Sequence, residues 1–186
     1  MLSYLKYIPN VLTLFRLFLV VPVVFSIARG HYQTALLIFM LAGFTDGLDG
    51  FLARRYSWQS ELGSLLDPLA DKFMMVAAFM SLALREQIPL WLLVMVMLRD
   101  LIIVAGVLVY HLKTRSIQMH PTLVGKANTL LQVLLIVIVL FNGGVYPVPD
   151  MMMSMVILAL LISTVLSCIG YVFLGIEKVN EHNHAN

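Results

Sequence analysis

Six long apolar stretches dominate this sequence, and each is about as long as a helix that crosses a membrane. They cover residues 11–28, 34–53, 63–84, 89–110, 123–141 and 151–174. A helix needs about 20 predominantly apolar residues to span the hydrocarbon core of a bilayer, with its backbone polar groups paired internally. The pattern therefore predicts an all-α, polytopic membrane protein with six transmembrane helices.

The connections between these stretches are short, so they leave no room for a separate soluble domain. We expect one membrane domain over residues 1–176, followed by a polar C-terminal tail at 177–186. Hydrophobic residues make up 61% of the chain and charged residues 12%, against about 45–50% and about 25% in soluble domains. This balance excludes a disordered chain and a typical nucleic-acid-binding protein. The single Cys168 excludes an intrachain disulfide.

Lysine and arginine are distributed unevenly between the connections, and this predicts the orientation of the chain. On the side of the N-terminus, the segments hold seven of them: Lys6, Arg54, Arg55, Lys113, Arg115, Lys126 and Lys178. The opposite segments hold two, Arg29 and Arg85. Because positive charge collects on the cytoplasmic side of a membrane, we expect both termini in the cytoplasm.

Four aspartates lie in or beside the second and third stretches: Asp46, Asp49, Asp67 and Asp71. An ionised side chain inside a span costs roughly 2.5–3.5 kcal/mol on the insertion scale, so four bare carboxylates would cost on the order of 10 kcal/mol. These side chains must therefore face one another, water or a metal ion.

Helical spacing predicts that the four carboxylates share one cleft. One set falls within an arc of about 100° on the second stretch: Asp46, Asp49, Gly50 and Ala53. A second set repeats at i, i+4 and i+8 on the third stretch: Gly63, Asp67 and Asp71. The small residues keep both faces low, so a ligand can approach closely.

The donor types in this predicted cleft point to a class of metal and of chemistry. The ligands are all oxygen, which favours hard cations such as Mg²⁺, Mn²⁺ or Ca²⁺ over zinc. Four carboxylates can hold two such cations, an arrangement suited to phosphoryl transfer. Arg54, at the cytoplasmic end of the second stretch, is placed to bind a phosphate.

The same residues resemble the signature of the CDP-alcohol phosphatidyltransferases. The match is Asp46-x-x-Asp49-Gly50-x-x-Ala53-Arg54, then eight residues, then Gly63-x-x-x-Asp67-x-x-x-Asp71, and every signature position is present. The resemblance implies an integral-membrane, usually dimeric enzyme. In such an enzyme an acceptor hydroxyl attacks the β-phosphorus of a CDP-linked lipid, and CMP leaves.

The resemblance also implies a role for each signature residue. Asp46, Asp49 and Asp67 would hold one metal ion on the diphosphate, and would thereby help to bind the CDP-lipid. Asp71 would help to hold a second metal ion and act as the general base. The remaining positions would bind the rest of the CDP-lipid, with Gly50 and Gly63 lining the cytidine pocket, Ala53 packed close by and Arg54 on the diphosphate. The cofactors would be two divalent cations, Mg²⁺ or Mn²⁺.

Further residues resemble the phosphatidylglycerophosphate synthase and cardiolipin synthase branches of this family. They are Pro9-Asn10-x-Leu12-Thr13-x-x-Arg16, Leu66-Asp67-Pro68-x-Ala70-Asp71-Lys72, Arg99-Asp100 and Lys126-x-Asn128-Thr129-x-x-Gln132. Both branches use CDP-diacylglycerol and an acceptor that carries a phosphate. A cleft with four basic side chains would suit such an acceptor: Arg16, Lys72, Arg99 and Lys126.

The leading expectation is transfer to glycerol 3-phosphate, which gives phosphatidylglycerophosphate and CMP. The alternative is a cardiolipin synthase, which uses phosphatidylglycerol as acceptor. Bacterial phosphatidylglycerophosphate synthases usually have Arg-Glu and Lys-x-Lys-Thr at these two motifs. This chain has Asp100 in place of the Glu and Asn128 in place of the second Lys, which favours the alternative. Against this, such synthases are the commoner kind in bacteria, and a short chain without a transit peptide favours a bacterial inner membrane, with the site facing the cytoplasm.

A cation transporter is the main alternative from another class. It predicts acidic residues spread along a path through the membrane. In this chain they cluster near the predicted cytoplasmic ends of two spans, beside Arg54 and Arg55. A structural membrane scaffold would have no need of four costly carboxylates. The pattern therefore favours an enzyme over both.

Overall fold

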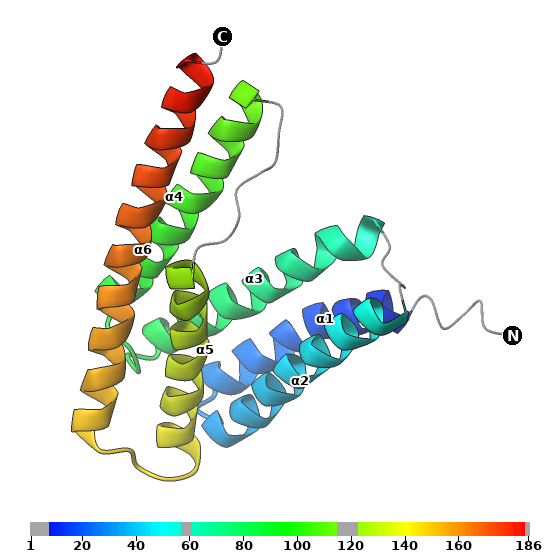
Figure 1. Ribbon diagram of the computed structural model, residues 1–186. Coiled ribbons are helices and arrows are strands. Elements are labelled where there is room, and N and C mark those ends of the chain that lie inside the picture. Colours follow the sequence, from blue (N-terminus) through cyan, green and yellow to red (C-terminus); the bar gives the residue numbers. More distant parts are fainter. Residues whose placement is uncertain (1–7, 57–60, 115–122, 185–186) are drawn as a thin grey trace, which may run out of the picture. The chain divides into compact units, whose positions relative to one another are not determined.

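The residues that the structure describes form six long helices, as the apolar stretches predict (Figure 1). A computed structural model describes residues 8–56, 61–114 and 123–184, and their side chains over 11–48, 56, 67–106 and 123–171. The helices are α1 (Ile8–Ala28), α2 (Tyr32–Tyr56), α3 (Glu61–Leu84), α4 (Leu90–Thr114), α5 (Leu123–Gly144) and α6 (Asp150–His184). The described residues form no strand, and α6 continues into the predicted tail as far as His184.

The chain groups into two compact units rather than one. The first contains Met1–Ile88 and Ile136–Val148, and the second contains Pro89–Leu135 and Pro149–Asn186. Helix α5 therefore contributes its last turns to the first unit and its earlier turns to the second. The prediction of a single membrane domain over residues 1–176 stays a prediction.

In the first unit, α1 packs against both α2 and α3. Its buried residues recur every fourth position, at Leu19, Val23 and Ile27, which places them on one face of the helix. The opposite face exposes Phe18 (72%) and Val21 (68%). Large exposed apolar side chains such as these suit contact with lipid, because their exposure to water is unfavourable.

The turn between α1 and α2 is closed by backbone geometry that favours glycine. Gly30 has a φ of 76°, a left-handed conformation that most side chains rarely adopt. Its amide donates to the carbonyl of Ile27 at 2.9 Å, and the amide of His31 donates to Ser26 at 2.9 Å. These bonds satisfy carbonyls at the end of α1 and reverse the chain into α2.

The last turn of α5 lies directly against the first turn of α2. A Cβ atom on Gly143 would lie 2.6 Å from the Tyr32 ring, and one on Gly144 would overlap the backbone of Gln33. Two glycines are therefore needed here because a side chain at either position would separate the helices. The contact ties α5 to the first unit.

In the second unit, α4 packs against α6. Leu92 and Val96 are buried on α4, and Leu160 is buried on α6. Polar residues are buried beside them, including Arg99, Asp100 and Asn128. The core of this unit therefore mixes aliphatic packing with a polar network, which is described below.

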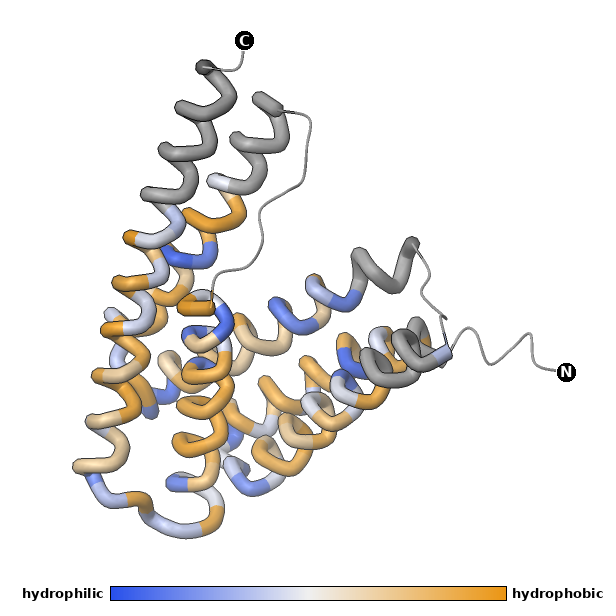
Figure 2. The backbone as a smooth tube through the Cα atoms, viewed as in Figure 1, coloured by the Kyte–Doolittle hydropathy of each residue, from blue (hydrophilic) through white to orange (hydrophobic). Residues whose placement is uncertain are grey.

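Within the described part of the chain, three helices are long and apolar enough to cross a membrane by length and composition: Val11–Ala28, Leu123–Gly144 and Asp150–Tyr171. Figure 2 shows apolar positions along most of α1, α5 and α6, and hydrophilic positions within α2, α3 and α4. The molecule is thus a helical membrane protein with several spans. That α2, α3 and α4 also cross, and that both termini are cytoplasmic, stay predictions.

Candidate active site

Helix α1 brings two polar side chains to the aspartates of α2 and α3. Thr13 and Arg16 lie three residues apart, so they project from the same face of the helix. Both are buried, with 2% and 1% of their surface exposed. Because α1 packs against α2 and α3 together, this face meets the aspartates of both helices.

Arg16 contacts one aspartate from each neighbouring helix. Its Nη1 atom lies 2.7 Å from Oδ1 of Asp46 on α2 and 3.1 Å from Oδ1 of Asp71 on α3. The two carboxylate side chains are 43% and 57% exposed, so they remain accessible although the guanidinium is enclosed. One buried cation thus holds together two carboxylates that are 25 positions apart in the sequence.

The third aspartate whose side chain is described, Asp67, is bound by Thr13, one turn before Arg16 on α1. The hydroxyl of Thr13 donates a hydrogen bond to Oδ1 of Asp67. Asp67 is half-buried and lies one turn before Asp71 on α3. Thr13 and Arg16 therefore fix three of the four predicted metal-binding aspartates from one helix face.

This arrangement fits a divalent cation by its donor chemistry. Carboxylate oxygens of Asp46 and Asp71 converge on one positively charged atom, and oxygen is the donor that Mg²⁺ and Mn²⁺ prefer. No group of three or more His, Cys, Asp or Glu side chains that could hold a metal ion occurs within the described part of the chain. The side chain of Asp49, the fourth predicted ligand, lies outside it.

Several other predicted site residues also lie where the structure describes no side chains. They are Gly50, Ala53, Arg54 and Gly63. Their backbone belongs to α2 and α3, as the spacing predicts. Their roles in binding a CDP-lipid stay predictions.

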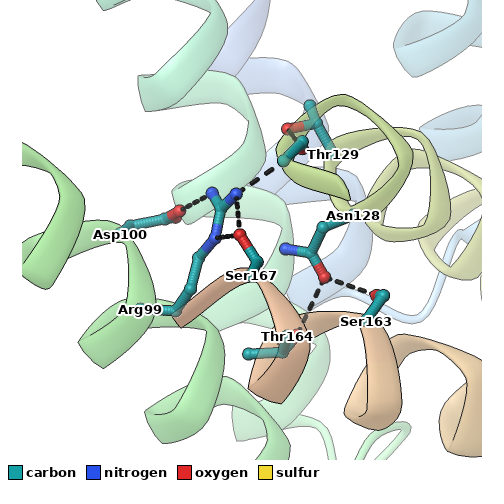
Figure 3. Close-up of polar contacts among 8 residues, drawn as sticks. Arg99, Asp100, Asn128, Thr129, Ser163, Thr164 and Ser167 are labelled. Atoms are coloured by element: carbon teal, nitrogen blue, oxygen red, sulfur yellow. Dashed lines mark hydrogen bonds and ion pairs between the residues drawn. The ribbon is translucent and has the colours of Figure 1, made fainter. Parts of the chain in front are cut away.

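In the second unit, Arg99 lies in a closed network of hydrogen bonds (Figure 3). Its Nη1 lies 2.9 Å from Oδ1 of Asp100, and its Nε and Nη2 donate to the hydroxyl of Ser167 at 3.1 and 2.8 Å. Nη2 also lies 3.5 Å from the carbonyl oxygen of Gly125 on α5. The Tyr171 ring lies 5.9 Å from the guanidinium carbon. The network joins α4, α5 and α6.

Asn128 of α5 makes a second link to α6 within this unit. The hydroxyls of Ser163 and Thr164 donate to its Oδ1 atom at 2.6 and 2.9 Å (Figure 3). Asn128 is 0% exposed, and its Nδ2 atom has no hydrogen-bond partner among the described residues. The Nε2 atom of Gln132, one turn further along α5, is in the same state.

The four predicted acceptor-binding residues thus have different surroundings. Arg16 contacts the aspartates, and the contacts described for Arg99 are with α4, α5 and α6. Lys72 is half-buried, directly after Asp71, and Lys126 is exposed at the start of α5. Their binding of an acceptor stays a prediction.

Four of the polar residues that complete these contacts have no role predicted from the sequence: Thr13, Ser163, Thr164 and Ser167. Thr13 does belong to the motif that ends at Arg16, and it lies three residues before that arginine in an otherwise apolar stretch. The other three lie at i, i+1 and i+4 in the apolar sixth stretch, which forms a polar stripe on one helix face.

The fold and the site define a helical membrane protein in which α1 gathers aspartates from two further helices. Comparison with known proteins names the class. The chain matches the CDP-alcohol phosphatidyltransferase family over residues 6–173 and belongs to this family. The match covers both units, and it confirms the family that the aspartate signature predicts.

Individual relatives come from two branches of the family. A cardiolipin synthase (CMP-forming) of Homo sapiens is 35% identical over 145 residues, which are 69% of this chain and 48% of the human protein. One of Streptomyces coelicolor is 38% identical over 112 residues, 56% of this chain and 52% of that protein. A CDP-diacylglycerol–glycerol-3-phosphate 3-phosphatidyltransferase of Aquifex aeolicus is 29% identical over 125 residues, which are 66% of this chain and 69% of that protein. The chain thus spans about half the length of the two cardiolipin synthases.

Proposed function

We propose that this protein transfers the phosphatidyl group of CDP-diacylglycerol to a hydroxyl of a phosphate-bearing acceptor and releases CMP. One observation carries the proposal. In a member of the CDP-alcohol phosphatidyltransferase family, Arg16 holds Asp46 and Asp71 from two helices at one nitrogen atom, and Thr13 binds Asp67 one turn before Asp71. A cluster of accessible carboxylates is the feature that metal-assisted phosphoryl transfer requires.

Divalent metal ions serve enzymes of this family. We propose that Asp46, Asp49, Asp67 and Asp71 would hold two of them, Mg²⁺ or Mn²⁺. When bound, such ions neutralise the diphosphate and stabilise CMP as the leaving group. The half-exposed carboxylates of Asp46 and Asp71 are accessible for this role.

The chain's own residues would then bind the donor and move one proton. Asp71 accepts the proton of the acceptor hydroxyl as that oxygen attacks the β-phosphorus, and the bond to CMP breaks. Gly50, Ala53 and Gly63 allow the nucleotide to approach the helices closely, and Arg54 binds the diphosphate. Arg16, Lys72, Arg99 and Lys126 are the proposed contacts of the acceptor phosphate.

Two acceptors fit this proposal. Glycerol 3-phosphate is the acceptor expected first from the sequence, and the name of the Aquifex relative includes it. Phosphatidylglycerol is supported by Asp100 and Asn128, and the human and Streptomyces relatives are cardiolipin synthases by name. We propose in either case an integral membrane enzyme, placed in a bacterial inner membrane with the site facing the cytoplasm and acting as a homodimer.

The test is an activity assay on purified protein in detergent with CDP-diacylglycerol and Mg²⁺ or Mn²⁺. Parallel samples receive glycerol 3-phosphate or phosphatidylglycerol, and CMP release and the lipid product are measured. Turnover with glycerol 3-phosphate alone identifies a phosphatidylglycerophosphate synthase, and turnover with phosphatidylglycerol alone identifies a cardiolipin synthase. No CMP release with either acceptor, at any metal concentration, contradicts the proposal.

A further inference from the structure

The position of Arg16 is unusual for a charged residue in an apolar helix. It lies inside the apolar segment Val11–Ala28 and is 1% exposed. A guanidinium removed from water needs carboxylate partners, because an uncompensated buried charge is strongly destabilising. Asp46 and Asp71 supply them from α2 and α3.

The carboxylates depend on Arg16 in a different way. Both are about half-exposed, so solvent already stabilises part of their charge. Their difficulty is mutual repulsion, since both approach one nitrogen atom and Asp67 lies one turn from Asp71. The guanidinium compensates that repulsion, and it keeps the carboxylate oxygens of two helices directed to one point.

A cation bound by Asp46 and Asp71 would be coordinated by the same carboxylate oxygens that now contact Nη1 of Arg16. We infer that Arg16 is the resident counterion of the aspartate cluster: it keeps the cluster assembled before a divalent cation binds, and it lowers the affinity of the cluster for that cation. The inference rests on the proposed metal-dependent function. It makes Arg16 a positioning residue, and the proposed contact with the acceptor phosphate is not needed for it.

Two consequences follow for the protein without metal and with metal. Removing the charge at position 16 destabilises the metal-free protein, because the carboxylates then repel one another without compensation. The same change strengthens metal binding, because a divalent cation no longer competes with a guanidinium for the same oxygens. A residue with a purely structural role would show the first effect and not the second.

The experiment compares wild type with Arg16→Gln, which removes the charge and keeps a polar side chain. Mn²⁺ affinity is measured by electron paramagnetic resonance of free Mn²⁺, and thermal unfolding in detergent is followed with and without Mn²⁺. We expect the Kd for Mn²⁺ to fall by about tenfold in Arg16→Gln, because the carboxylates are partly screened by solvent and one unit charge is removed. The rise in Tm on adding Mn²⁺ becomes larger than in wild type.

Two further variants keep the inference testable if Arg16→Gln does not accumulate. Arg16→Lys keeps the charge, but the lysine side chain is shorter, so its ammonium does not reach as far as Nη1 and competes less with a cation for the two carboxylates. The Kd therefore falls by roughly threefold. Thr13→Val is the matched control on the same helix face, because it removes a neutral contact to Asp67. It does not strengthen Mn²⁺ binding.

The possible outcomes separate this inference from the proposed function. An unchanged or weaker Mn²⁺ affinity in Arg16→Gln or Arg16→Lys, with wild type binding Mn²⁺, overturns the inference and leaves the proposed function intact. A wild type that binds no Mn²⁺ contradicts the metal sites of the proposed function, and the inference fails with them. Equal strengthening in Thr13→Val also overturns it, because the effect would then not come from the charge.

Discussion

Two buried arginines, Arg16 and Arg99, both pair with aspartates, but the aspartates differ in where they come from and in how exposed they are. Both lie in apolar helices, and they are 1% and 6% exposed. The carboxylate partners of Arg16 come from two other helices and are about half-exposed. The carboxylate partner of Arg99 is the next residue in the chain, Asp100, whose side chain is 9% exposed. The comparison distinguishes a charge cluster that is open to a ligand from one that is enclosed by protein.

The open cluster can exchange partners because solvent or a ligand reaches its carboxylates. In the enclosed network the guanidinium donates hydrogen bonds to the hydroxyl of Ser167 and the carbonyl of Gly125, which stabilise the charge but also occupy its donors. Substitutions in the first cluster should therefore change chemistry, and substitutions in the second should change stability.

The largest expected effect is loss of turnover in Asp71→Asn. The amide keeps the shape of the side chain but cannot accept the proton of the acceptor hydroxyl, and removing a general base lowers the rate by about 10²–10⁴-fold. CMP release measures the effect. Equilibrium binding of CDP-diacylglycerol should persist, because Asp46, Asp49 and Asp67 remain. Turnover near that of wild type would remove Asp71 from the role of base.

The next effect is destabilisation by Arg99→Ala. This change removes the ion pair with the buried Asp100 carboxylate, and breaking a buried pair costs about 3–5 kcal/mol. Thermal unfolding in detergent is the measurement, and the double variant Arg99→Ala/Asp100→Ala should recover part of the loss. If Arg99→Ala unfolds like wild type and instead raises KM for the acceptor, then Arg99 binds the acceptor and the enclosed network is not primarily structural.

The smallest effect is that of Thr13→Val, which is nearly isosteric and removes the hydrogen bond to Asp67. Asp67 is half-buried, so solvent replaces part of the lost contact and the free energy of unfolding falls by about 0.5–1.5 kcal/mol. Chemical denaturation measures the change, with Thr13→Ser as the control that keeps the hydroxyl. Equal losses in both variants would show that packing of the methyl group, and not the hydrogen bond, is responsible.

The helices could be predicted closely from the sequence because hydropathy and length determine them. The helix α1 begins at Ile8 and α5 ends at Gly144, each within three residues of the predicted limits. The largest difference is at α6, which continues ten residues beyond the predicted end at residue 174. Polar residues of 177–184 extend a helix there, so low hydropathy marks the end of the apolar segment and not the end of the helix.

The side-chain contacts were harder to predict because they depend on how distant helices pack. The aspartate spacing predicts that Asp46 and Asp71 face one another, and the structure brings both to one atom of Arg16. The sequence does not predict these contacts of Arg16, and the binding of an acceptor phosphate by Arg16 stays a prediction. Which face of α1 meets α2 and α3 is decided by packing along the whole helix, including Leu19 and Val23.

The Arg16 contacts also have a consequence for biosynthesis. The chain emerges from the ribosome N-terminus first, so Arg16 leaves it before Asp46 and Asp71 have emerged. An unpaired arginine near the centre of an inserting helix costs about 2.5–3.5 kcal/mol on the insertion scale. The ion pairs of Arg16 are therefore complete only when α3 has emerged.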